Sequence, residues 1–206
     1  MSDKAQRVRD PEGTRTAIID AAERLFAENG FAATSMRDIS TASGVSHPLI
    51  HHYFGSKDEL YLAVKRRLVE GYAKRFPRAA RAVGRPLGVR AEMRRLRAFL
   101  GENPMLLRLC QRTRLEGDNQ VWPGEPDQLD TLRRRIEVSQ SRGLIRSDLD
   151  ASYLGIMILG LVSFCVENRD HFSKRFGDKF DEQAYFRQAI ALVERGSAPG
   201  PDDPAV

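Results

Sequence analysis

The sequence has few of the features that mark secreted, metal-binding or membrane-spanning proteins. It contains 2 cysteines in 206 residues, Cys110 and Cys165, which are too few for a disulfide framework and lack the paired spacing of a zinc site. The first ten residues are charged and contain no apolar leader segment, and the longest apolar stretch, residues 154–166, is shorter than the roughly 20 residues of a membrane span. We therefore expect a cytoplasmic protein that is neither secreted nor membrane-spanning.

Residue patterns that carry catalysis are also missing. The sequence contains no Gly-rich phosphate-binding loop, no nucleophile elbow, no Cys–His arrangement and no HExxH pair. We therefore expect no enzymatic activity and no bound cofactor.

Positive charge is in excess over the whole chain but not in its N-terminal part. The formal net charge is +5, with 33 Lys and Arg against 28 Asp and Glu, yet residues 1–60 carry seven basic and nine acidic side chains. Residues 74–97 hold nine basic residues and one acid. This run is compatible with a basic patch that binds successive phosphates of a nucleic acid. The apolar residues interleaved with it instead favour the solvent-exposed face of helices.

Apolar residues recur at helical spacing along almost the whole chain, without an alternating strand pattern or an Asn-Gly hairpin. The expected fold class is therefore all-α. Caps, glycines and prolines place the expected helices at residues 14–30, 35–44, 46–54, 56–76, 89–100, 104–116, 126–142, 149–172 and 182–195. Within this series, Ser35, Ser46 and Ser56 are the expected N-caps, and Ser35 and Ser56 each have an acidic residue three positions later.

Residues 36–54 have the layout of a helix-turn-helix. Apolar Ile39 and Ile50 would fix the crossing of two short helices, small Ser40 would let them approach, and Gly44 would allow the sharp turn before Val45. In this geometry the second helix can project into the major groove of DNA.

A longer segment, residues 14–64, resembles the N-terminal domain of the tetracycline-repressor (TetR) family of bacterial transcription regulators. The residues that carry the resemblance are Ala21, Ala22, Leu25, Phe26, Gly30, Phe31, Thr34, Ser35, Asp38, Ile39, Gly44, Val45, Ser46, Tyr53, Phe54, Ser56, Lys57 and Leu60. The resemblance implies an N-terminal three-helix helix-turn-helix DNA-binding domain at 13–56 and a C-terminal helical ligand-binding and dimerisation domain at 57–195. A flexible arm at 1–12 and a disordered tail at 196–206 would flank them.

The same resemblance assigns DNA contacts to individual residues. Thr34, Ser35 and Lys57 would meet phosphates, and Arg37 would reach a base edge or the backbone. The groove-facing side of the second helix would consist of His47, Pro48, Leu49, His51, His52 and Tyr53, with Ser46 at its start. Where the family usually has Leu-Tyr, this chain has Ile50 and His51, so an imidazole replaces the tyrosine that commonly contacts the backbone.

Three histidines within six residues also admit other interpretations. His47 and His51 are four residues apart on one helix face and would chelate a metal if a third ligand arrived, but no Cys or nearby acid completes a tetrahedral site. His52 is compatible with simple packing against the domain. DNA contact is the favoured role, and no metal is predicted.

Residues 154–166, within the expected helix 149–172, are apolar around most of their circumference, which predicts burial on all sides and therefore a role in both the core and a homodimer. In the resembled family, the last two long helices form the dimer bundle. The middle helices would enclose a small-molecule effector pocket whose residues stay unassigned. We therefore expect an effector-responsive repressor that binds a pseudo-palindromic operator. The alternative is a helical adaptor that binds proteins without reading DNA.

Overall fold

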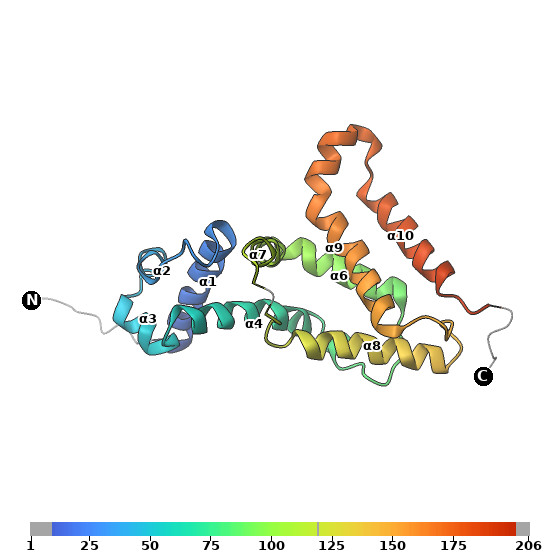
Figure 1. Cartoon of the computed structure of the whole chain (residues 1–206), viewed down its shortest axis with the longest axis horizontal. Helices are drawn as coiled ribbons and strands as arrows, with labels where there is room; N and C mark the ends of the chain where they lie inside the picture. The colour runs from blue at the N-terminus through green and yellow to red at the C-terminus, as the bar shows by residue number, and fades with distance from the viewer. Residues whose placement is uncertain (1–9, 119, 201–206) are drawn as a thin grey trace, which may run out of the picture. The chain divides into compact units, whose positions relative to one another are not determined.

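The computed structural model describes residues 10–118 and 120–200, and within these ranges it contains helices and no strand. The predicted all-α class is confirmed. In chain order the elements are α1 Pro11–Asn29, α2 Met36–Ser43, α3 His47–Phe54, α4 Lys57–Arg75, α5 Pro77–Ala80, α6 Val89–Glu102, α7 Pro104–Leu115, α8 Glu125–Ser141, α9 Ala151–Phe176, the 3-10 turn η1 Gly177–Lys179 and α10 Glu182–Gly196 (Figure 1).

The chain folds as two compact units, and it passes from one to the other inside α4 and inside α7. The first unit comprises the described residues up to Leu68 and those between Arg108 and Gln120, and the second comprises Val69–Leu107 and the described residues from Val121 onward. In the first unit α1, α2 and α3 follow each other closely in space (Figure 1). Its core is built on Phe26, Ile39, Ile50 and Leu60, which are fully buried.

The first helix begins earlier than its apolar pattern indicates. We expected it from residue 14, whereas α1 starts at Pro11, because Asp10 accepts a hydrogen bond from the backbone N–H of Gly13 and proline fits the first turn. Residues 11 and 12 of the expected arm are thus helical, and residues 1–9 lie outside the described part. At the other end, Ser197 caps α10 and is buried, while residues 201–206 of the expected tail lie outside the described part.

Two of the three expected serine caps form. Ser35 and Asp38 make a reciprocal capping box at the start of α2, and Ser56 and Glu59 exchange the same pair of hydrogen bonds at the start of α4. Ser46 stands at the N-cap position of α3, but its side chain makes no capping hydrogen bond. Only its backbone carbonyl takes part, accepting from Leu49 and Ile50.

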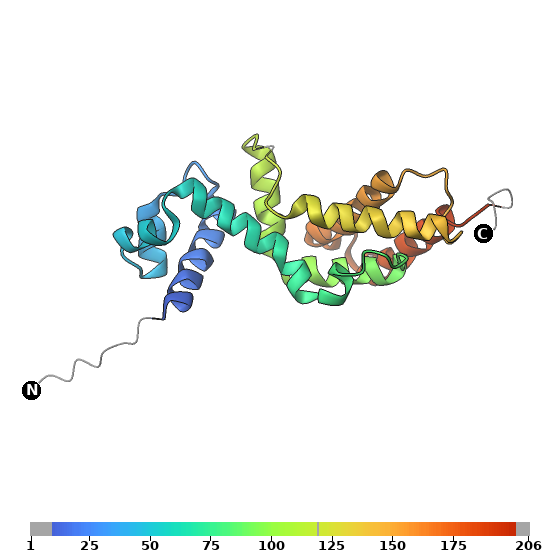
Figure 2. The same cartoon turned by 90° about the horizontal axis from the view of Figure 1, so that it is seen from below.

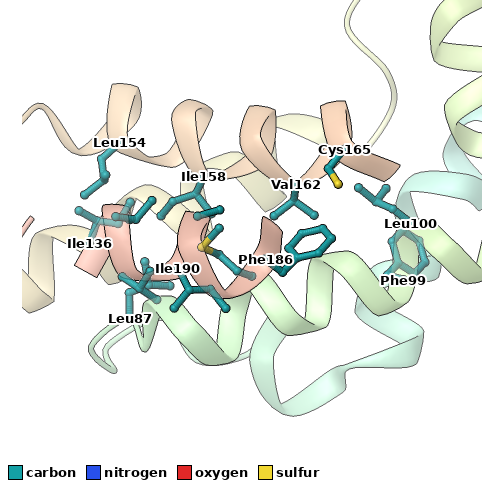
Figure 3. Packing of buried hydrophobic residues seen from close by; sticks show 14 of the residues in the cluster. Leu87, Phe99, Leu100, Ile136, Leu154, Ile158, Val162, Cys165, Phe186 and Ile190 are labelled. Atoms are coloured by element: carbon teal, nitrogen blue, oxygen red, sulfur yellow. The ribbon is translucent and has the colours of Figure 1, made fainter. Parts of the chain in front are cut away.

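The second unit is organised around α9, which packs against α6, α8 and α10 (Figures 1 and 2). Leu154, Ile158, Val162 and Cys165 form a row along α9 that faces Phe186 and Ile190 of α10, as Figure 3 shows. Phe99 and Leu100 of α6 and Ile136 of α8 extend this core. The spacing of three and four residues along α9 is that of one helix face, so this face belongs to the core.

The opposite face of α9 is apolar but lies on the surface. Tyr153 and Phe164 are 68% and 56% exposed, and Ile156 and Met157 are exposed as well. By length and composition alone, the segment Ala151–Lys179 is able to cross a membrane, a test that the core helix of a soluble protein also passes. The sequence predicted that this helix is buried on all sides. Within a single chain, only one of its faces is buried.

Candidate nucleic-acid interface

The turn between α2 and α3 is set by Gly44 and Ser40. Gly44 has a φ of 69° and a ψ of 13°, the left-handed conformation that glycine adopts without steric cost, and its N–H donates to the carbonyl oxygen of Ser40 at 3.0 Å. The Ser40 hydroxyl reaches across the turn and donates to the carbonyl oxygen of Val45 at 2.6 Å. The angle between the two helices is thus fixed by hydrogen bonds as well as by packing.

Two residues of α3 pack it against the rest of the unit, and most of its other side chains are exposed to solvent. Ile50 and Phe54 are buried, and the guanidinium of Arg15 lies 5.2 Å from the centre of the Phe54 ring. The residues with exposed side chains are Ser46, His47, Pro48, Leu49, His51 and His52, and Tyr53 is half-buried. An eight-residue helix held by one face and open on the other is suited to lie in a major groove about 12 Å wide.

Two histidines of α3, His47 and His51, lie in contact, and His51 also bonds to the backbone. The rings of His47 and His51 meet edge to face with their centres 4.6 Å apart. Nδ1 of His51 lies 2.5 Å from the carbonyl oxygen of Gly55. Because a carbonyl oxygen only accepts, Nδ1 of His51 donates this hydrogen bond, and Nε2 is left for another partner. Among the described residues, no group of three or more His, Cys, Asp or Glu side chains is placed to hold a metal ion.

Thr34 differs from the other residues for which a DNA contact is expected. Its side chain is 2% exposed, and its hydroxyl donates to the carbonyl oxygens of Gly30 at 2.8 Å and Leu25 at 3.2 Å. The hydroxyl therefore holds the segment before α2 and does not face solvent. Lys57 holds the same segment, since its Nζ donates to the carbonyl oxygens of Phe31 and Thr34. An ammonium has three N–H donors, so one remains for a phosphate.

The start of α2 carries the other expected phosphate contacts. The Ser35 hydroxyl is exposed but donates to Asp38 at 2.6 Å, and these hydrogen bonds hold the pKa of Asp38 below its ordinary value. Arg37 has an exposed side chain in the same turn. The first turn of α2 also presents backbone N–H groups that the helix itself cannot pair, and such groups bind phosphate oxygens.

Several residues that shape this unit carry no signal in the sequence that predicts their role. Ser40 was identified only as a small residue. The end of α7 joins the unit through Arg112 and Glu116, which bond to the backbone at the end of α1, and through Asp118, which pairs with buried Lys65 at 2.5 Å. These partners are 53 to 85 residues apart in the chain, so no local pattern reveals them.

Comparison with known proteins agrees with this geometry. Residues 18–64 match the family described as "Bacterial regulatory proteins, tetR family". The chain is 26% identical to the HTH-type transcriptional repressor NicS of Pseudomonas putida over 191 residues, which cover 86% of this chain and 88% of that protein. It is 53% identical to the HTH-type transcriptional repressor Rv3405c of Mycobacterium tuberculosis over 53 residues, which cover 26% and 28% of the two chains.

Solved structures extend the likeness of the fold to most of the chain. The transcriptional regulator SCO4942 from Streptomyces coelicolor superimposes with a TM-score of 0.72 at 19% identity, covering 93% of this chain and 99% of that one. The TetR family transcriptional regulator PfmR from Thermus thermophilus gives a TM-score of 0.62 at 21% identity, covering 90% and 98%.

A fixed turn between two short helices, with the second helix open to solvent, defines a helix-turn-helix DNA-binding protein. Residues 18–64 match the DNA-binding domain of the TetR family, and the chain is a DNA-binding transcriptional regulator. The matched family consists of regulators and not of enzymes.

Proposed function

We propose that the protein is a cytoplasmic repressor that binds a pseudo-palindromic operator as a homodimer and leaves it when a small-molecule effector binds. The observation that carries the proposal is the exposed face of α3, which offers His47, His51 and His52 on a helix anchored by Ile50 and Phe54. Imidazole nitrogens either accept from base amino groups or donate to base and phosphate oxygens, depending on their protonation.

The proposed contacts are of two kinds: contacts to phosphates, which position the protein on the DNA, and contacts to base edges, which recognise the sequence. Backbone N–H groups at the start of α2, together with Ser35 and Lys57, would hold phosphates and set the register on the duplex. Arg37 and the exposed residues of α3 would meet base edges. We assign Thr34 to the support of this surface, because its hydroxyl is engaged inside the fold.

The homodimer is proposed from the apolar side of α9. Tyr153, Ile156 and Phe164 recur along one face that no part of the described chain covers, and Leu192 of α10 is exposed as well. Large apolar side chains repeated along one helix face mark an association surface more often than isolated ones do. A two-fold dimer through α9 and α10 would place two copies of α3 on half-sites roughly 34–36 Å apart or more.

We assign DNA binding to residues 13–56 and effector binding with dimerisation to residues 57–195. Two helices carry residues of both units, α4 and α7. The effector signal would pass along them, since α4 begins with Lys57 and the end of α7 bonds to α1.

A titration at two salt concentrations tests the proposal. Purified protein is added to a fluorescent duplex from the promoter beside its own gene, with a scrambled duplex of equal length as the control. We expect specific binding that weakens by about 0.9 log units per log unit of salt for each phosphate neutralised. Absent or salt-insensitive binding would contradict the proposal and favour an adaptor that binds proteins.

A further inference from the structure

One groove of the second unit is lined by five arginines and, among the described residues, by no acid. Its volume is about 510 Å³, and the end of α4, the segment after it, α6 and α8 form its walls. The arginines are Arg75, Arg78, Arg85, Arg95 and Arg135, and the other lining residues are Phe76, two prolines and two alanines. We call this site the arginine groove.

Two of these arginines share a single buried carboxylate. Oε2 of Glu92 lies 2.5 Å from Nη2 of Arg95 and 2.6 Å from Nη1 of Arg135, and the Tyr72 hydroxyl donates to its other oxygen. Burial alone would raise the pKa of Glu92, but the hydrogen bonds from Tyr72, Arg95 and Arg135 hold it below its ordinary value. The cluster therefore contains two guanidinium charges and one carboxylate charge.

The same two guanidiniums have unused hydrogen-bond donors. Nε of Arg95 and Nε of Arg135 are buried and have no partner among the described residues, and Arg135 as a whole is 6% exposed. A buried N–H without an acceptor and a buried charge without a counter-charge both destabilise the folded state. An anion in the groove would supply the missing counter-charge. It would also accept hydrogen bonds from the two Nε atoms if the guanidiniums turned their Nε edges toward it.

We propose that the arginine groove binds a small organic carboxylate, and that this ligand is the effector of the repressor, a step that rests on the function proposed above. Glu92 already demonstrates that Arg95 and Arg135 bind a carboxylate from two directions. Planar guanidiniums match carboxylate geometry. Phe76, the prolines and the alanines give the groove an apolar wall, which suits the hydrocarbon body of such an acid better than a sugar-phosphate backbone.

The position of the groove gives its ligand a route to the DNA-binding unit. Arg75 is the last residue of α4, and Lys57, the first, bonds to the backbone just before α2. Arg75 now pairs with Glu102, with Nε 3.1 Å from Oε2. A carboxylate that competes with Glu102 for Arg75 would shift the end of α4, and a helix that shifts as a unit carries its first residue with it.

The test uses the full chain and a panel of probes. Benzoate and octanoate are the carboxylates, benzamide is the neutral counterpart of benzoate, and inorganic phosphate is the anion without an apolar body. Binding is measured by calorimetry and by the shift in melting temperature. The variants are Arg95→Gln and the exposed pair Arg78→Gln with Arg85→Gln. Arg81→Gln is the matched control, because Arg81 is an exposed arginine of the same segment outside the lining.

We expect at least one carboxylate to bind and to stabilise the wild type and Arg81→Gln, while benzamide does neither. Each groove variant should weaken this binding by about tenfold or more, the loss expected for a charge-assisted hydrogen bond. The paired variant keeps the test valid if Arg95→Gln fails to fold. In the presence of the carboxylate, operator affinity should fall by roughly 5- to 150-fold.

Equal binding of benzamide, no binding of either carboxylate, or unchanged binding by the variants would overturn the proposal. A different result would identify the groove as a contact for the DNA backbone: phosphate binds but the carboxylates do not, and the variant with Arg78→Gln and Arg85→Gln loses operator affinity in the absence of ligand. Operator binding without ligand is measured separately. If the chain binds a carboxylate but not the operator, the proposed ligand of the groove is supported and the repressor function is refuted. If the chain binds the operator but no carboxylate, only the proposal for the groove is refuted.

Discussion

The carboxylate of Glu116 accepts a hydrogen bond from the backbone N–H of Phe31 at 3.1 Å, although 85 residues separate them in the chain. One turn earlier, Arg112 donates to the carbonyl oxygen of Glu28 at 2.5 Å. These two bonds join the end of α7 and the residue after it to the end of α1 and the segment that follows α1. Effector binding that moves α7 would therefore act on the DNA-binding unit without passing through α4.

Gly30 should be less replaceable than Gly44. Gly30 has a φ of 85° and a ψ of 173°, a region that only glycine enters readily, and a β-carbon there would overlap the Glu116 carboxylate. Gly44 is left-handed with open space around it. We expect Gly44→Ala to lower the free energy of unfolding by about 1–2 kcal/mol and Gly30→Ala to lower it by more, as measured in urea.

A double-mutant cycle separates the two causes at Gly30. In a Glu116→Ala background the overlap is gone and only the backbone strain remains, so Gly30→Ala should cost less by about 0.5–3 kcal/mol. Strictly additive effects of the two substitutions would contradict the contact between Glu116 and this turn.

His51→Ala should change which bases are preferred. The Nδ1–H bond to Gly55 leaves Nε2 for a base edge, and in a neutral ring this atom accepts from the amino group of adenine or cytosine. We expect operator affinity to fall by about 1–3 kcal/mol, with the loss concentrated at one base pair per half-site. The measurement is anisotropy against single-base operator variants. Arg81→Ala replaces an exposed residue of the second unit that lies outside α3 and α9, and it is the control. A uniform loss across all variants would indicate a backbone contact instead.

Acid should unfold the protein in part through Glu92 and Asp118. Burial would raise both pKa values, but the hydrogen bonds from arginine, lysine and tyrosine partners hold them below their ordinary values. A carboxyl with a depressed folded-state pKa stabilises the fold above its unfolded pKa of about 4 and loses that contribution as the pH falls through the folded value. The free energy of unfolding should therefore drop from pH 5.5 toward pH 3. Glu92→Gln should flatten this slope, and an identical slope in that variant would contradict the assignment.

Charging the exposed face of α9 should abolish dimerisation. Ile156→Glu combined with Phe164→Glu places two carboxylates on the proposed interface, where like charges meet across the two-fold axis. We expect a folded monomer by light scattering and a large loss of operator affinity. Leu115→Glu, at a still more exposed leucine at the end of α7, should stay dimeric. A dimer that survives both α9 substitutions would place the interface elsewhere.

Local signals in the sequence predicted most of the helices. The Ser35–Asp38 and Ser56–Glu59 capping boxes set the starts of α2 and α4 where expected, because capping depends on residues three positions apart. The four-residue helix α5 and the turn η1 were not predicted, since elements this short have no periodicity to detect.

The site was predictable only where exposure follows from position on a helix. His47 and His51 share a face because they are four residues apart, and both are exposed. Thr34 showed the limit of this reasoning, since its burial depends on the carbonyl oxygens of Leu25 and Gly30. The shared carboxylate of Glu92 joins residues 43 apart and becomes visible only in three dimensions.

Hydroxyl-radical footprinting on the promoter DNA tests the central claim, that α3 reads an operator twice over in a symmetric pair. Wild-type protein should protect two half-sites related by a pseudo-two-fold axis, with centres roughly 10 base pairs or a multiple of that apart. The His47→Ala, His51→Ala double variant should lose this protection at the same protein concentration while keeping its helical circular dichroism. Protection that is absent from the wild type, or unchanged in the double variant, would contradict the account.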